Sequence, residues 1–221
     1  MPCPYLSGYV ERNLFTELRG GQAQEHHETL TRAGFRRSHH IVYRPACPGC
    51  TGCVPVRIVA DDFRPNRSER RILKRNADLS AALLDPIATD EHYAIFAAYQ
   101  HDRHSDGEMA AMTFSDFRAM VEDTAVDTQL VEFRNSDGTL IAGCLIDRIS
   151  DAFSAVYSYY DPQERNRGLG NFMILWLVET AASIGLSYVY LGYWIEDCDK
   201  MAYKTRYRPI ELLGDAGWET L

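Results

Sequence analysis

Two segments in the second half of the chain combine residue types that handle anions. The first is Arg165-Asn-Arg167-Gly168-Leu-Gly170, which stands between a strand pattern and an apolar helix pattern. Glycines there would let the backbone approach a phosphate, and a helix N-terminus offers N–H groups and a partial positive charge. This context predicts a phosphate-binding loop at Arg165, Arg167, Gly168 and Gly170. The alternative is a glycine turn that serves packing only.

The second segment, Lys200-Met-Ala-Tyr203-Lys204-Thr-Arg206-Tyr-Arg-Pro209, is rich in cations and tyrosines. Lys200 and Lys204 are four residues apart, so a helix would present both on one face. We expect this short element to close the site beside the phosphate loop. Together the two segments suggest an enzyme that moves an acyl group from a phosphate-bearing carrier.

The strand before the phosphate loop ends in Tyr157-Ser-Tyr-Tyr160-Asp161-Pro162. A backbone N–H at such a strand end can polarise the carbonyl that is attacked during acyl transfer. We expect the backbone near Tyr160 to be this oxyanion donor. The alternative is that the tyrosines only pack.

A basic cluster lies in the first half of the chain. It holds one acid, Glu69, and six cations: Arg64, Arg67, Arg70, Arg71, Lys74 and Arg75. A helix that begins at Ser68 would place like charges four residues apart, which is mildly unfavourable for the helix itself. An anionic partner should compensate, and a nucleic-acid backbone is the obvious one. The alternative is a solvated basic face.

Cys47, Cys50 and Cys53 offer three soft ligands with two residues between neighbours. Zinc or an iron–sulfur cluster would need a fourth ligand from among Cys3, His26, His27, His39 and His40. The alternative is a set of thiols around a tight Gly/Pro turn. The three cysteines are too close together to staple a fold with disulfides.

The composition bounds the class of protein. Over 221 residues the chain is 46% hydrophobic and 24% charged, which is ordinary for a globular protein of one large or two small domains. Its formal charge of −8 argues against indiscriminate nucleic-acid binding, although a local patch can still bind, and we expect no DNA partner. We see no membrane span and no secretory signal, so we expect a cytoplasmic protein.

Periodicity predicts an α+β fold. Three consecutive strands are expected at 129–134, 139–150 and 152–160, followed by a helix at 168–184 and a strand at 188–191. This is the central order of the GNAT-type acyltransferase fold. The other expected elements are strands at 41–43 and 54–59 and helices at 22–33, 68–84, 90–103 and 113–122. We expect a smaller α/β region at 1–80 with the cysteine loop and basic helix, a boundary near 79–90, and a GNAT-like catalytic domain at 90–221.

With these residues assembled, the chain resembles the aminoacyl-tRNA–protein transferases of the N-end rule pathway, and among them the bacterial aspartate/glutamate leucyltransferases. The similarity covers nearly the whole chain and rests on the following segments: Cys3-Pro-Tyr-Leu6, Gly34-Phe-Arg36-Arg37-Ser38, Tyr43-Arg-Pro-Ala-Cys47-Pro-Gly-Cys50-x-x-Cys53-Val-Pro-Val-Arg57, Phe63-Arg64-Pro-x-Arg67-Ser68-x-Arg70-Arg71, Tyr188-Val-Tyr-Leu-Gly-Tyr-Trp194-Ile195 and Lys200 to Pro209. Leu6 stands where arginyltransferases carry the second cysteine of a Cys-x-x-Cys pair. That departure favours the leucyl group and argues against the metal site.

The resemblance implies transfer of leucine from leucyl-tRNA to the N-terminal α-amine of proteins that begin with Asp or Glu. The tRNA would lie along the basic helix at Arg64, Arg67, Arg70, Arg71 and Lys74, with its acylated end near the phosphate loop. The acceptor's acidic side chain would be bound by cations and a tyrosine: Lys200, Tyr203, Lys204 and Arg206.

Aminolysis of an activated ester requires no cofactor. The α-amine has a pKa of about 7.7–8.0, so a useful fraction is neutral and positioning supplies most of the acceleration. Asp161 is a candidate to collect the proton, although an Asp before Pro is often a turn residue.

Three other functions remain open from the sequence. An arginyl-tRNA–protein transferase would use the same acceptors. An acetyl-CoA-dependent N-acetyltransferase would use the same loop but has no need for the basic cluster. A metal-containing RNA-binding module would explain the cysteines and the cluster but leaves the phosphate loop without a role.

Overall fold

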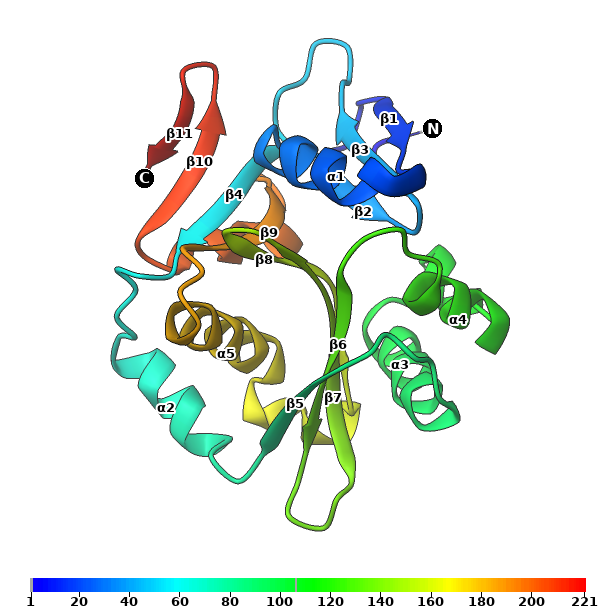
Figure 1. Cartoon of the computed structure of the whole chain (residues 1–221), viewed down its shortest axis with the longest axis vertical. Coiled ribbons are helices and arrows are strands. Elements are labelled where there is room, and N and C mark those ends of the chain that lie inside the picture. Colours follow the sequence, from blue (N-terminus) through cyan, green and yellow to red (C-terminus); the bar gives the residue numbers. More distant parts are fainter. Residues whose placement is uncertain (1, 106) are drawn as a thin grey trace.

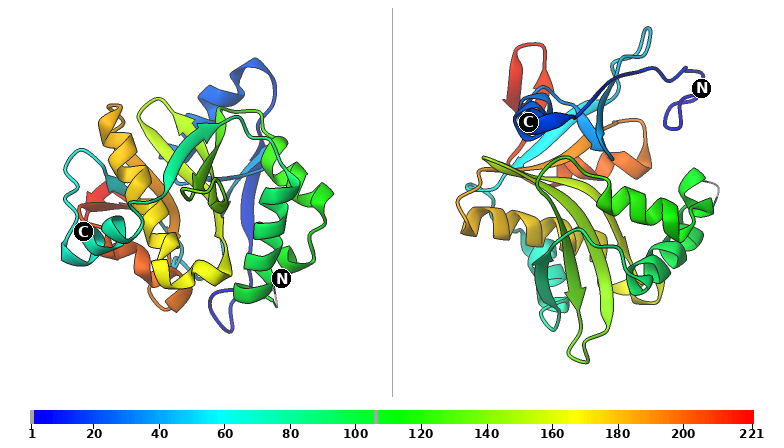
Figure 2. Two further views of the ribbon diagram at one scale, coloured as in Figure 1. Left: turned by 90° about the horizontal axis from the view of Figure 1, so that it is seen from below. Right: turned by 45° about the vertical axis from the view of Figure 1, so that its right-hand side comes forward.

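The computed structural model describes residues 2–105 and 107–221 and has an eight-stranded sheet at its centre. The strand order is β11-β10-β4-β9-β8-β7-β6-β5. Figures 1 and 2 show α2 and α5 on one face of this sheet, and α3, α4 and the N-terminal elements on the other. None of the helices in the described residues is long and apolar enough to cross a membrane.

The strands are β1 (Asn13–Glu17), β2 (Arg36–Ser38), β3 (Ile41–Pro45), β4 (Val54–Val59), β5 (Ser80–Leu84), β6 (Thr128–Arg134), β7 (Leu140–Ile149), β8 (Ala152–Tyr160), β9 (Tyr188–Trp194), β10 (Ile210–Gly214) and β11 (Gly217–Thr220). The α-helices are α1 (Ala23–Arg32), α2 (Arg67–Arg75), α3 (Asp90–Arg103), α4 (Phe114–Glu122), α5 (Leu169–Ser183) and α6 (Asp199–Ala202). Short 3₁₀ helices are η1 (Gly20–Gln22), η2 (Glu108–Ala111), η3 (Pro162–Arg167) and η4 (Tyr203–Arg206).

The predicted α+β order of the second half is confirmed. Strands β6, β7 and β8 form an antiparallel meander, and β8 then connects through α5 to β9, which lies parallel to it. The first hairpin turns at Asn135, whose side-chain oxygen accepts the N–H groups of Asp137 and Thr139. Helix α5 is apolar on most sides because it lies between the sheet and α2.

The expected helix at 68–84 is wrong in its length and in its start. It begins at Arg67, because the side chain of the N-cap, Asn66, accepts the N–H groups of Ser68 and Glu69 while Glu69 completes a capping box. The helix ends at Arg75, and residues 80–84 form the edge strand β5, paired with β6 from Ser80↔Arg134 to Leu84↔Leu130. Pairing across the sheet has overridden the local helical tendency of this alanine- and leucine-rich stretch.

The N-terminal elements form a three-stranded sheet, β1-β3-β2, with α1 beside it. A buried ion pair fixes this region to the central sheet, since Arg37 of β2 donates two hydrogen bonds of 2.7 Å to Asp147 of β7. Strand β4 leaves the region and enters the central sheet between β10 and β9. The central sheet therefore contains strands from both sides of the expected boundary, and the division into 1–80 and 90–221 stays a prediction about folding units.

Candidate active site

The central sheet opens where β8 and β9 part. The two strands pair at three positions, from Ala152↔Tyr188 to Ser154↔Tyr190. Immediately after the last pair β8 bulges, because Leu145 lies opposite Tyr157 and Ile146 lies opposite Ala155, which leaves Val156 as the extra residue. A bulge bends its strand. Backbone groups of β8 beyond this point are therefore freed from β9 and can face a substrate.

The end of β8 presents a backbone N–H to the open side. Tyr160 lies opposite Ala142 of β7, and the N–H of the next residue, Asp161, donates to the carbonyl of Ile141 at 2.9 Å. In an antiparallel ladder neighbouring residues direct their N–H groups to opposite sides, so that of Tyr160 points away from β7. The Asp161 carboxylate accepts the N–H of Gln163 at 2.9 Å as the cap of η3.

The phosphate loop has the predicted form. Gly168, with φ of 72°, joins η3 to α5, and no side chain caps the first turn of α5. The first N–H groups of a helix have no intrahelical acceptor, so those of Leu169, Gly170 and Asn171 remain available to an anion. A Cβ on Gly170 would meet no atom of the described chain within 4 Å. Packing does not require a glycine there, whereas an approaching phosphate would.

The basic helix is fastened to the phosphate loop. Arg75 donates to the Asn166 carbonyl at 2.7 Å, and Asn76 donates to the Arg167 carbonyl at 3.1 Å. In return the Arg167 guanidinium donates to Asn76 Oδ1 at 2.9 Å and pairs with Asp78. Arg167 therefore joins the two elements, while Arg165 is exposed.

The cations of the basic cluster face solvent. Their only acid, Glu69, is buried in the helix cap. No carboxylate in residues 2–105 or 107–221 forms an ion pair with any of the six exposed cations, Arg64, Arg67, Arg70, Arg71, Lys74 and Arg75. The exposed face of α2 and its approach therefore carries six cations that no carboxylate among the described residues neutralises.

The expected shared face of Lys200 and Lys204 is wrong. Helix α6 ends at Ala202 and the chain tightens into η4, so Lys200 is exposed while Lys204 is buried. The Lys204 ammonium donates to the Tyr193 carbonyl of β9 at 2.6 Å. Burial, and then the charge of Arg36, lowers the pKa of Lys204 to about 7. Tyr203 is half-buried, with its pKa raised by burial, and Arg206 is exposed.

The four cysteines of the expected metal site lie near one another. Burial, followed by the nearby thiols of Cys3, Cys47 and Cys50, raises the pKa of Cys53 to about 11. Thiols are suitable donors for zinc or an iron–sulfur cluster. However, no three His, Cys, Asp or Glu side chains in the described part of the chain stand in an arrangement that could hold a metal ion. The four thiols are the right kind of ligand for zinc or an iron–sulfur cluster, but they are not arranged to bind one.

Sequence reasoning missed three residues of this region. Asn76 and Asn171 act at the phosphate loop, the latter by accepting the Tyr207 hydroxyl at 2.6 Å, and Arg36 enters the gap between β8 and β9. Arg36 stands in the quoted segment Gly34 to Ser38, so the family resemblance was the one signal that included it. No spacing rule connects it to a strand 120 residues later.

Family models match both halves of the chain. The model "Arginine-tRNA-protein transferase, N terminus" matches residues 1–71, and "Arginine-tRNA-protein transferase, C terminus" matches residues 91–214. The chain is 56% identical over 219 residues to the aspartate/glutamate leucyltransferase of Paramagnetospirillum magneticum, with 99% of this chain and 90% of that protein covered. It is 51% identical over 219 residues to the protein of the same name in Rhodospirillum rubrum, with 99% and 89% covered.

Among solved structures, L-PGS from Bacillus licheniformis has a TM-score of 0.51 at 12% identity and covers 65% of this chain and 45% of its own. At this identity the likeness concerns the fold alone. With the meander, the helix and the parallel strand, it confirms the predicted GNAT-like acyltransferase fold.

Proposed function

Since the chain belongs to the arginine-tRNA–protein transferase family and is therefore an aminoacyl-tRNA–protein transferase, we propose that it moves leucine from leucyl-tRNA to proteins that begin with Asp or Glu. The observation that carries the choice of leucine is the near full-length identity to relatives named aspartate/glutamate leucyltransferase. The reaction takes place in the cytoplasm, where charged tRNA is available.

The donor is held by phosphate contacts. The tRNA backbone is bound by five exposed cations on α2 and in the segment just before it: Arg64, Arg67, Arg70, Arg71 and Lys74. The acylated 3′ end reaches the loop at Arg165, Gly168 and Gly170, where free N–H groups of α5 donate hydrogen bonds to its phosphate. Arg167 contributes by holding the loop against α2.

The chemical step is aminolysis of the leucyl ester. The neutral α-amine of the acceptor attacks the ester carbonyl carbon, and the backbone N–H of Tyr160 donates to the developing oxyanion. The attacking nitrogen gives up a proton, the C–O bond to the tRNA ribose breaks, the ribose oxygen takes a proton in its place, and the peptide bond is left. Asp161 follows Tyr160 directly in the sequence, so its carboxylate is our candidate proton acceptor. The same carboxylate also caps η3 by accepting the N–H of Gln163.

The acceptor side chain is held by the segment from α6 to η4. Lys204 supplies the buried charge, Lys200 and Arg206 supply exposed charges at the entrance, and Tyr203 lies between them in the chain. Zinc or an iron–sulfur cluster at Cys3, Cys47, Cys50 and Cys53 would require these side chains to rearrange, so metal analysis of the purified protein tests it, and no step above uses it.

The proposed donor is tested by offering leucyl-tRNA, arginyl-tRNA and acetyl-CoA with peptides that begin with Asp, Glu, Arg or Ala. We expect leucine on the Asp and Glu peptides only. Arginine transfer without leucine transfer would change the donor, and acetyl transfer at a comparable rate would change the class of enzyme.

Arg70→Ala and Arg71→Ala are expected to weaken tRNA binding and to flatten its salt dependence. Each lost phosphate contact should reduce the slope of log affinity against log salt by about 0.7–0.9. Filter binding across a salt series measures the slope. Arg118→Ala is the matched control, because Arg118 is exposed on α4 on the opposite face of the sheet. If the slopes equal that of the parent, the cations of α2 do not contact tRNA phosphates and only face solvent.

The affinity for Glu-starting peptides is expected to fall as the pH rises through about 7, the pKa of Lys204. The sign follows because the ammonium is charged below its pKa and only the charged form attracts a carboxylate. Lys204→Met should have a higher KM and should lose the rise of KM with a midpoint near pH 7, keeping only the pH dependence of the acceptor's own α-amine, whereas Lys200→Met should keep the full pH profile of the parent. The measurement is KM for the peptide from pH 6 to 8.5. An unchanged pH profile in Lys204→Met would remove Lys204 from the acceptor site.

A further inference from the structure

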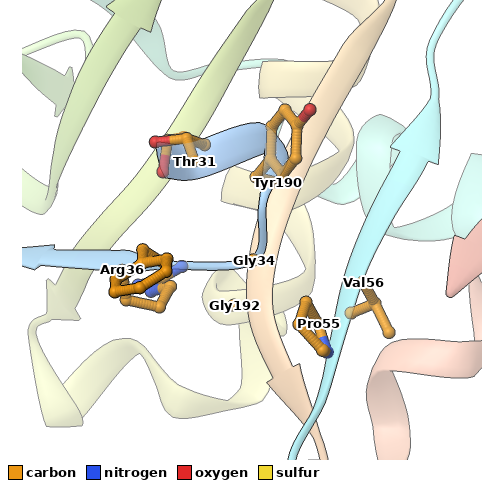
Figure 3. A pocket seen from close by; sticks show the side chains of 9 residues that line it. Thr31, Gly34, Arg36, Pro55, Val56, Tyr190 and Gly192 are labelled. Atoms are coloured by element: carbon orange, nitrogen blue, oxygen red, sulfur yellow. The ribbon is translucent and has the colours of Figure 1, made fainter. Parts of the chain in front are cut away.

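Arg36 bridges the two strands at the point where they part. From β2 its Nη2 donates to the carbonyl of Val156, the bulge residue of β8, at 3.2 Å. On the other side its guanidinium lies against the backbone of β9, where a Cβ on Gly192 would come within 2.7 Å of Nη1. Figure 3 shows Arg36 beside β9 at Gly192. Gly192 has φ of 76°, so both its conformation and this contact require glycine.

One buried nitrogen of Arg36, Nη1, has no hydrogen-bond acceptor among the described residues. A buried donor without an acceptor costs free energy, and a charged one costs more. Beside it lies a small crevice of about 10 Å³, lined by Arg36, Gly192, Ser154 and Tyr190, which is about the size that one water or one ligand oxygen needs. Nη1 is therefore placed to donate to a ligand.

The surroundings of Arg36 carry uncompensated positive charge. Lys204 donates to the carbonyl of Tyr193, the residue after Gly192, and is close enough for the charge of Arg36 to lower its pKa. Among the described residues, neither cation forms an ion pair with a carboxylate. Among the described residues, the thiols of Cys198 and Cys53 are the groups that raise the pKa of Lys204, and no carboxylate does so. A buried lysine beside a half-buried arginine, with no counter-ion among the described residues, favours an anionic ligand.

The position of Arg36 in the fold indicates which anion it binds. The donor's phosphate loop belongs to α5, on one face of the sheet, whereas Arg36 reaches the gap from the N-terminal elements on the other face. The side-chain carboxylate of an N-terminal Asp or Glu is only a few bonds from the α-amine, so it must bind close to the attacked carbonyl, on the side of β8 that faces away from β7, where Arg36 contacts the Val156 carbonyl. Guanidinium groups bind carboxylates with two parallel hydrogen bonds.

We propose that Arg36 binds the side-chain carboxylate of the acceptor's N-terminal Asp or Glu between β8 and β9, with Lys204 as the second cation. This inference rests on the proposed transfer to acidic N-termini, and it assigns Arg36 as the residue that binds the acidic side chain. Arg36 belongs to the N-terminal half of the chain, whereas the groups that act in the reaction belong to the C-terminal half. Binding of the acceptor would therefore need both halves.

The test compares two peptides that differ only in their first residue, Glu or Gln. We measure kcat/KM for leucyl transfer to both, in the parent, in Arg36→Gln and in Arg36→Lys. In Arg36→Gln the value for the Glu peptide is expected to fall roughly 10- to 150-fold, as expected when a charge-assisted hydrogen bond is lost, through a higher KM. The value for the Gln peptide should change less than about twofold, since that peptide never used the charge. Arg36→Lys should retain part of the preference for Glu.

The outcomes separate this inference from the proposed function. Arg44→Gln on the neighbouring strand β3 is the control, because Arg44 is exposed, and it should keep the Glu preference of the parent. Equal losses on both peptides would show that Arg36 only holds the strands together, and would overturn the inference. A parent that transfers leucine to neither peptide would instead refute the proposed function. If Arg36→Gln fails to fold by thermal unfolding, the Glu/Gln ratio of Arg36→Lys decides: a ratio equal to that of the parent overturns the inference.

Discussion

Gly170→Val is expected to lower the rate of leucyl transfer on the order of 100-fold while the protein stays folded, because displacing a reactant by about an ångström can cost that much. The Cβ of the new side chain meets nothing in the described chain, so the fold has no reason to fail. It does project from the first turn of α5, into the space that the phosphate of the tRNA end would occupy. The loss should therefore appear in transfer and in affinity for leucyl-tRNA, and not in the melting temperature.

Two other glycines make the comparison specific. Gly21→Val, in η1, also adds a side chain to open space without a positive φ, and it should transfer at the rate of the parent. Gly168→Val should lower stability as well as activity, because φ of 72° is strained for a β-branched residue. A Gly170→Val protein that binds leucyl-tRNA normally and transfers at full rate would show that the loop serves packing only. Arg165 would then be left as the residue of this loop that can hold the carrier.

Asp147→Asn is expected to destabilise the protein by roughly 3–5 kcal/mol, the cost of leaving a buried charge without its partner. The side chains of Arg37 and Asp147 are 1% and 0% exposed. Asp147 also accepts from the hydroxyl of Thr128 and lies 3.4 Å from His27, so one substitution disturbs the whole junction between the N-terminal elements and the central sheet. Urea unfolding at neutral pH measures the free-energy difference.

A double variant and a surface control complete that experiment. Arg37→Met with Asp147→Leu should recover much of the loss, because two apolar side chains bury no unpaired charge. Glu91→Gln breaks an exposed pair with Arg134 and should change the free energy of unfolding by about 1 kcal/mol or less. If Asp147→Asn unfolds at the same urea concentration as the parent, the buried pair does not hold the two parts of the chain together.

The elements that the sequence predicted well have strong local signals. Helix α3 has the expected bounds of Asp90–Arg103, with Thr89 as its cap, and the meander has alternating or apolar strands with a clear Asn-Ser-Asp-Gly turn. The segment 68–84 failed because its last five residues have no apolar periodicity of their own and all five are exposed. Their strand exists because β6 offers an edge, and this information lies some fifty residues further along the chain.

The parts of the candidate site that lie within one continuous segment were predictable from the sequence. The loop at Gly168 and Gly170 lies between the strand and the helix that were expected. Lys204 was expected to share an exposed helix face with Lys200, and its burial beside β9 was not foreseen, because the helix that would have exposed it ends at Ala202. Arg36 depends on a bulge in β8, a positive φ in β9 and the docking of β2, and no local pattern contains all three.

The most direct test of the account is the identity of the product. The purified protein is incubated with leucyl-tRNA and a Glu-starting peptide, beside the same peptide with an acetylated N-terminus, and the products are fragmented in a mass spectrometer. We expect one added leucyl residue, joined to the α-nitrogen of the Glu, and no addition to the acetylated peptide. Leucine on the acetylated peptide, on a lysine side chain, or on neither peptide would contradict it.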